Sequence, residues 1–216
     1  MRKFLKGVTA LLGVMGLSPV AEAQTLRMMK SLDAPHYDGQ RTTWSPTSDI
    51  VNMFQDTLVA MDWDGKTAIP YLAKSWTISP DGKLYTFKLR DDVQFCSGKK
   101  FTAADVIYSF TRLADPSARW PFYWRLGEID SLTAPDPYTL VYKLKRPHSE
   151  LLVDLANFAA TIINKENVEA LGADFGVKGF DGTGPYCWVS WSPREVLVLQ
   201  RHPTYSWGPR EMYQNP

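Results

Sequence analysis

Few side chains in this sequence have the type and spacing that catalysis or metal binding requires. His36, His148 and His202 lie far apart, and none shares metal-ligand spacing with another histidine, a cysteine or a carboxylate. Asp91 and Asp92 look like a carboxylate pair, but adjacent residues of a strand point to opposite faces and would not share a proton. Because G-x-S-x-G, H-E-x-x-H and C-x-x-C are all absent, we predict no catalytic residue, no metal ligand and no cofactor.

Cys96 and Cys187 are the two cysteines of the chain, and they could form a disulfide. An oxidising compartment and an even count of cysteines both favour pairing. The loop that the bond would enclose gives about 4 kcal/mol of stabilisation in the chain-entropy model. The alternative is a pair of buried free thiols, and the residues alone leave both open.

Aromatic side chains gather in segments that are expected to be loops. Any one of these rings could simply cover the core. As a set, they suit a concave site that holds a small organic or peptidic ligand by ring stacking and backbone hydrogen bonds. The set includes Trp44, Trp120, Phe122, Tyr123 and Trp124.

Residues 1–23 have the three parts of a signal peptide. Basic "MRKFLK" precedes the apolar run "GVTALLGVMGL", which is too short to span a membrane comfortably, and "AEA" is a small-x-small cleavage signal. No cysteine follows the cleavage site directly to carry a lipid anchor, so we expect an exported, soluble chain. The remaining residues include 21 basic and 22 acidic ones, which argues against nucleic acid or an anionic membrane as the partner.

Turn residues and apolar periodicity predict an α+β fold rich in hairpins. Pro80-Asp81-Gly82 should join strands 75–79 and 83–90, because proline fixes one turn dihedral and glycine supplies a positive φ. "TAAD", residues 102–105, is a capping box ahead of a helix that ends at Asp115-Pro116. In the first part of the chain we also expect a strand after residue 24 and a helix that is capped by Ser48 or Asp49 and carries Ile50, Met53, Phe54 and Leu58 on one face. A hairpin that turns at 135–137, a helix capped by Ser149 and a short strand at 160–163 should follow. The last expected elements are a helix closed by Gly172 and two strands joined at Ser192-Pro193.

Two long segments resemble a known family. "LAKSWTISPDGKLYTFKLRDDVQFCSGKKFTAADVIYSFTRL", residues 72–113, closely resembles the signature of the extracellular solute-binding proteins that serve oligopeptide, dipeptide and nickel ABC importers. "GTGPYCWVSWSPREVLVLQRHPTYSWG", residues 182–208, resembles the second recurring segment of that family. Two long matches in the right order, behind a signal peptide, are much more specific than one short motif.

The resemblance implies a non-enzymatic, monomeric protein of the periplasm. Such a protein captures a peptide or similar small solute between two lobes and delivers it to an ABC importer permease in the membrane, and nickel is the less favoured solute. Family members are much longer than this chain, so the resemblance implies a periplasmic binding protein-like first lobe with the second lobe missing, as in a fragment. Residues 24–58 and 178–216 would form the core of that lobe, and residues 59–177 an inserted, hairpin-rich subdomain.

The resemblance also bears on the cysteines and on the ligand site. The family's loop reads F-H-D-G where this chain has "FCSG", and Cys187 departs from the pattern too, so a disulfide between Cys96 and Cys187 is the natural hypothesis. The alternatives are a secreted hydrolase with its catalytic residues beyond Pro216, and a non-functional truncated lobe or interaction module. By resemblance, the solute cleft would be lined by Tyr37, Thr43, Trp44, Trp120, Tyr123, Trp124, Asn157 and Phe158.

Overall fold

The computed structural model describes residues 25–208, so the expected signal peptide at 1–23 lies outside the described residues. Contacts divide the chain between Ser31 and Leu32. Residues 25–31 are exposed and have no helix or strand, so the strand expected after residue 24 is wrong. Its residues pair with no strand in the part of the chain that the structure describes, and a strand needs a neighbour to satisfy its backbone groups.

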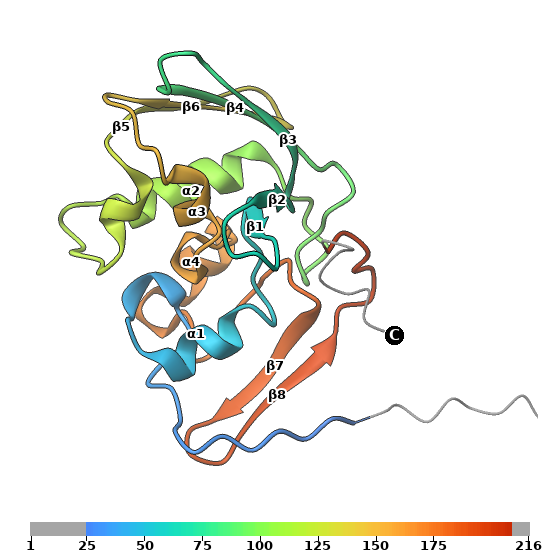
Figure 1. Cartoon of the computed structure of the whole chain (residues 1–216). Helices are drawn as coiled ribbons and strands as arrows, with labels where there is room; N and C mark the ends of the chain where they lie inside the picture. The colour runs from blue at the N-terminus through green and yellow to red at the C-terminus, as the bar shows by residue number, and fades with distance from the viewer. Residues whose placement is uncertain (1–24, 209–216) are drawn as a thin grey trace, which may run out of the picture. The chain divides into compact units, whose positions relative to one another are not determined.

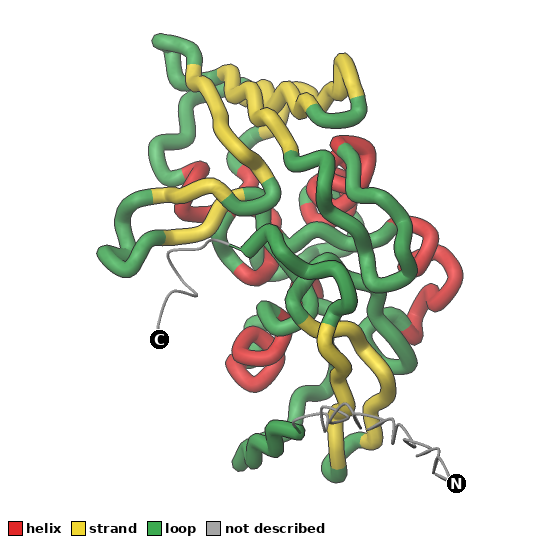
Figure 2. The backbone as a smooth tube through the Cα atoms, turned by 90° about the vertical axis from the view of Figure 1, so that its right-hand side faces the viewer, coloured by secondary structure: helices red, strands yellow, loops and turns green. Residues whose placement is uncertain are grey.

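The strands of residues 32–208 form three antiparallel sheets, and mixed α/β is the fold class that the sequence predicts. Two are two-stranded ribbons; in Figure 2 the β7–β8 ribbon lies apart from the larger sheet, whereas the β1–β2 ribbon lies beside the end of β3. The larger sheet has four strands in the order β3-β4-β6-β5. The strands are β1 (Val59–Met61), β2 (Ala68–Pro70), β3 (Ala73–Ile78), β4 (Leu84–Leu89), β5 (Ile129–Asp136), β6 (Thr139–Leu144), β7 (Tyr186–Ser192) and β8 (Val196–Arg201).

Both expected hairpins of the large sheet are confirmed. β3 and β4 pair with Trp76 opposite Phe87, and Gly82 has the positive φ of 67° that the turn requires. β5 and β6 turn at residues 135–137 as expected, and β6 then pairs with β4. The two hairpins therefore lie side by side, and they bury the alternating side chains of β4: Tyr85, Phe87 and Leu89.

Four α-helices and four 3₁₀ turns connect the strands among residues 32–208. The capping box of Thr102 and Asp105 is confirmed: each side chain accepts the other's backbone N–H. None of the described helices has the length and apolar character needed to cross a membrane. The helices are α1 (Ser45–Val51), α2 (Ala103–Leu113), α3 (Leu151–Leu155) and α4 (Lys165–Leu171), and the 3₁₀ turns are η1 (Gly39–Arg41), η2 (Tyr123–Leu126), η3 (Phe158–Ala160) and η4 (Gly172–Asp174).

The expected starts of two helices and one expected strand are wrong. α1 begins near Trp44 because proline suits the first turn of a helix, and it ends before Leu58, whose carbonyl accepts a 2.8 Å bond from Ala73. α3 has Glu150 rather than Ser149 at its N-cap, and no side chain caps it. Residues 160–163 are buried but form no strand, because their backbone makes single bonds, such as that from Ile162 to the Asp56 carbonyl (2.8 Å), in place of a ladder.

Apolar side chains form two clusters. The first includes Phe87, Phe110 and Tyr142, from the large sheet and from α2, and Figure 1 shows that this helix lies against one face of the sheet. The second joins residues 34–54 to residues 163–180, with rings of β7 packed against it. Both clusters contain residues of the expected lobe core and of the expected inserted subdomain, so that division stays a prediction.

Candidate functional site

Two of the eight side chains expected to line the solute cleft are used in packing. Tyr37 is buried, and its ring meets those of Phe54, Trp188 and Trp191 edge-on at 6.2, 5.6 and 5.0 Å. Burial and the nearby Asp33 carboxylate raise the pKa of Tyr37 to about 12.

Trp120 is half-buried and closes the end of α2. Its indole N–H donates to the carbonyl of Arg112 (2.8 Å), and its ring lies 4.9 Å from the Arg112 guanidinium. Both interactions hold Trp120 against the helix, so this ring supports its loop.

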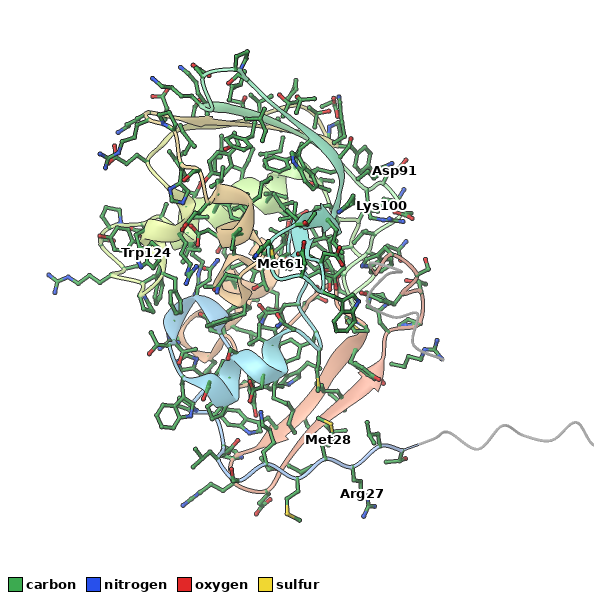
Figure 3. All side chains as sticks on the ribbon, in the orientation of Figure 1. Arg27, Met28, Met61, Asp91, Lys100 and Trp124 are labelled. Carbon is green, nitrogen blue, oxygen red and sulfur yellow. A yellow bond between two sulfur atoms is a disulfide. The ribbon has the colours of Figure 1, made fainter. Side chains whose placement is uncertain are left out.

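Four of the remaining six are exposed. The exposed fractions of Trp44, Tyr123 and Trp124 are 48%, 53% and 51%, and Thr43 is exposed beside Trp44. Figure 3 shows Trp124 at the edge of the described chain, on the side opposite Asp91 and Lys100. An exposed aromatic ring can stack on a ligand, which buries apolar area and adds a specific geometry.

Phe158 is the place where three loops meet. Its ring contacts that of Phe122 edge-on, with centroids 5.4 Å apart. Phe122 immediately precedes Tyr123 and Trp124 in the chain. A Cβ placed on Gly39 in η1 would lie 2.9 Å from the Phe158 carbonyl oxygen, so η1 and η3 pack backbone against backbone. Asn157 supports η3 because its side chain accepts the N–H of Ala159 (3.0 Å).

We call the rings carried by these loops the aromatic surface. Its loops come from three separate parts of the chain: Phe122 contacts Phe158, and Trp44 lies three residues after η1, which packs against η3. Its members are Trp44, Phe122, Tyr123, Trp124 and Phe158.

Two arginine–aspartate pairs fix the loop that carries Tyr123 and Trp124. At the N-terminal side of this loop, Arg112 donates to the buried Asp38 carboxylate (2.6 Å) while supporting Trp120. At the other side, Arg125 pairs with the buried Asp154, and its guanidinium lies 4.7 Å from the Trp124 ring. A buried ion pair is costly to desolvate and fixes geometry rather than adding much stability.

The sequence alone does not predict these anchoring residues. Asp38 and Arg112 lie 74 positions apart, and Arg125 and Asp154 lie 29 positions apart. No local motif links residues at such separations, so only the tertiary structure shows the pairs. His148 joins the second pair through its Nε2, 2.8 Å from Asp154.

A cleft lies beside the disulfide. Cys96 and Cys187 are bonded, with 2.02 Å between the sulfur atoms, and they line an open cleft of about 740 Å³. Asp181 accepts from the backbone and hydroxyl of Ser97 (2.9 and 2.6 Å) and from the Asn164 amide (2.6 Å). The polar groups at the base of the cleft are therefore occupied by one another.

A fully buried carboxylate lies at a third position. Asp56 accepts from the Tyr71 hydroxyl (2.5 Å) and the Trp207 indole N–H (2.9 Å). Burial raises the pKa of Asp56 to about 7, and the two donors oppose this rise. No cation is paired with Asp56 among the described residues, so the donors alone balance its charge.

The adjacent carboxylates Asp91 and Asp92 do not face each other. Asp91 pairs with Lys74 and Asp92 with Arg90, each at 2.6 Å. Each carboxylate thus has a cation of its own, and the pair shares no proton.

The chain matches the model of a known family over residues 67–214: "Bacterial extracellular solute-binding proteins, family 5 Middle". The chain belongs to this family. The resemblance seen in residues 72–113 and 182–208 is therefore confirmed.

Individual relatives agree with this assignment. The glutathione-binding protein GsiB of Pectobacterium atrosepticum is 32% identical over 199 residues, which cover 92% of this chain and 38% of that protein. The ABC transporter-associated periplasmic binding protein DppA from Helicobacter pylori, solved with the peptide STSA, is 30% identical with a TM-score of 0.72; the match covers 82% of this chain and 38% of DppA.

The fold is shared more widely. The substrate-binding domain of an oligopeptide ABC transporter from Bacillus anthracis has a TM-score of 0.76 at 24% identity, over 82% of this chain and 38% of that chain. This chain therefore spans well under half the length of the proteins that it matches.

Proposed function

We propose that this family 5 chain is the solute-binding component, or the first lobe of it, of an ABC-type importer in the periplasm. It would capture a peptide or similar small solute between two lobes and deliver it to the permease. The observation that carries the proposal is the aromatic surface, where exposed rings are anchored by buried ion pairs in a chain of a solute-binding family.

A peptide suits this surface for physical reasons. Extended peptides are held through main-chain hydrogen bonds, which tolerate varied side chains, and stacked rings add apolar area without demanding one sequence. Two relatives also point to peptides, since one is a glutathione-binding protein and the other was solved with the peptide STSA. The predicted ligand-lining residues that remain accessible are Thr43, Trp44, Tyr123, Trp124, Asn157 and Phe158.

The family assignment favours solute capture over the alternative of a secreted hydrolase. Among the described residues, the carboxylates Asp91, Asp92, Asp38 and Asp154 are each paired with a cation. None of these four is placed as the free base of a nucleophile. We therefore propose a non-enzymatic, monomeric protein.

Titration with pools of di-, tri- and tetrapeptides, followed by calorimetry, tests the proposal. We expect heat of binding with at least one pool, and a loss of about fivefold in affinity for Trp44→Ala or Trp124→Ala, because one ring contact contributes about 1 kcal/mol. Trp63→Ala is the matched control, because Trp63 is 73% exposed but lies on the turn between β1 and β2. Absence of binding to every pool, or equal losses for Trp63 and Trp124, would contradict the proposal.

A further inference from the structure

Three metal-ligating residues meet at the disulfide end of the cleft. Cys96, Cys187 and His202 each offer one ligand atom, and these atoms all lie within 4.8 Å of one another. Two sulfurs and an imidazole nitrogen are ligands that zinc accepts in proteins. The sequence reading missed this grouping, because the three residues are 91 and 15 positions apart.

His202 lacks the partners that a buried histidine normally has. Its side chain is 2% exposed, and Nε2 is buried without a hydrogen-bond partner among the described residues. Nδ1 lies 3.5 Å from the Thr204 hydroxyl, and the tautomer in which Nδ1 donates its proton to this hydroxyl leaves the Nε2 lone pair free for a metal ion. Leaving a buried polar atom unpaired is unfavourable, so such atoms call for an explanation.

Backbone hydrogen bonds also hold the three residues close together. The Cys96 N–H donates to the Gly182 carbonyl (2.9 Å), and the His202 N–H donates to the Pro185 carbonyl (2.8 Å). Cys187 is opposite Gln200 in the β7–β8 ladder, two residues before His202. Breaking the disulfide therefore leaves two thiols and an imidazole near one another.

We propose that reduction of the Cys96–Cys187 disulfide creates a zinc site made of two thiolates and His202. A dithiol reductant supplies two electrons and two protons, which convert the S–S bond into two thiols, and the reductant becomes a disulfide. Zn²⁺ then binds the two sulfurs and displaces their two protons. Both cysteines line the cleft, so a water molecule from the cleft completes the tetrahedral set.

The oxidised chain does not bind in this way, since its sulfurs are bonded to each other. The site is a property of the reduced protein and does not depend on solute capture at the aromatic surface. A phosphine is the better reductant in the test, because dithiols themselves bind zinc; it takes up oxygen from water, whose two protons complete the thiols.

The test is titration of the full chain with Zn²⁺ against a chromophoric chelator, before and after phosphine reduction, with Co²⁺ as the spectroscopic probe. We expect one Zn²⁺ per reduced chain, none in the oxidised chain, and a thiolate-to-cobalt charge-transfer band. His202→Gln should weaken Zn²⁺ binding by at least about tenfold, since even supporting residues of zinc ligands have effects of that size. His148 contacts the buried Asp154 and is not one of the three proposed ligands, so His148→Gln should leave Zn²⁺ binding unchanged.

A second readout keeps the test decisive if a variant folds poorly. In the reduced wild-type chain, Zn²⁺ should protect both cysteines from alkylation, as measured by mass spectrometry. Failure of the reduced chain to bind Zn²⁺, binding that is equal in the His202→Gln and wild-type chains, or alkylation that Zn²⁺ does not slow would each overturn the proposal.

Discussion

Replacing Asp56 with asparagine is expected to remove a large part of the pH dependence of stability above about pH 4. Asp56 is fully buried, and its pKa is about 7 in the folded chain against a reference value of 3.8. Because the folded pKa is raised, the folded state binds more protons than the unfolded state between these two values. Stability therefore falls as pH rises from about 4 to about 7, and the loss is complete above the folded pKa.

The size of the effect follows from the shift. About three units of pKa correspond to a factor of about a thousand, or about 4 kcal/mol, over the whole window. Between about pH 5 and about pH 8 the part that remains is about 3 kcal/mol. Asparagine stays neutral throughout, so the Asp56→Asn chain should lack this part while keeping a carbonyl acceptor for one of the donors, such as the Trp207 N–H.

Urea unfolding of both chains at about pH 5 and about pH 8 measures the difference. The wild-type free energy of unfolding should fall by about 3 kcal/mol more than that of Asp56→Asn. Taking the difference between chains removes the opposing contributions of His36 and His202, whose pKa values are lowered by burial. Asp130→Asn is the control, because Asp130 is exposed and its pKa is lowered by Lys143. Identical pH slopes for wild type and Asp56→Asn would refute the reasoning.

Three substitutions and one control substitution, all measured by urea unfolding, test the packing that positions the site. Gly182→Ala should destabilise the chain by at least about 3 kcal/mol, because its Cβ would lie 1.8 Å from the Phe54 carbonyl oxygen. Gly179→Ala is the control: the nearest neighbour of its Cβ is a leucine methyl at 3.3 Å, so the chain should lose less than about 1 kcal/mol of stability. Phe110→Ala should lose about 3–5 kcal/mol by leaving a cavity under the large sheet, and a smaller loss would mean that α2 collapses into the space. Thr102→Ala should lose about 1 kcal/mol with its half of the capping box, and no loss would mean that the cap is dispensable.

The elements that the sequence predicts well are those fixed by local chemistry. Pro80-Asp81-Gly82 dictates a turn whose glycine has φ of 67°, and the Thr102–Asp105 capping box starts α2 where expected. Gly172 likewise ends α4, with φ of 53°. In each case the deciding interaction lies within a few residues, so the sequence contains it directly.

The errors lie where distant residues decide. Residues 160–163 have the apolar character of a strand, but their neighbours offer single hydrogen bonds and no partner strand. Tyr37 and Trp44 look equivalent as loop aromatics, yet the rings of Phe54 and Trp188 cover the first and leave the second exposed. Burial of a loop side chain depends on which segments pack over it, and that is a tertiary property.

The way in which the aromatic surface is anchored bears on its role. Rings that only cover a core need no buried charges, because apolar contact would hold them. Here Arg125 connects the loop with Tyr123 and Trp124 to the buried Asp154. Because the two charges must be desolvated, this ion pair adds little stability. Such a pair does fix direction, and binding residues carried on loops need a rigid support. An exposed indole held in one direction by a buried ion pair is therefore better explained by a partner that stacks on it than by packing alone.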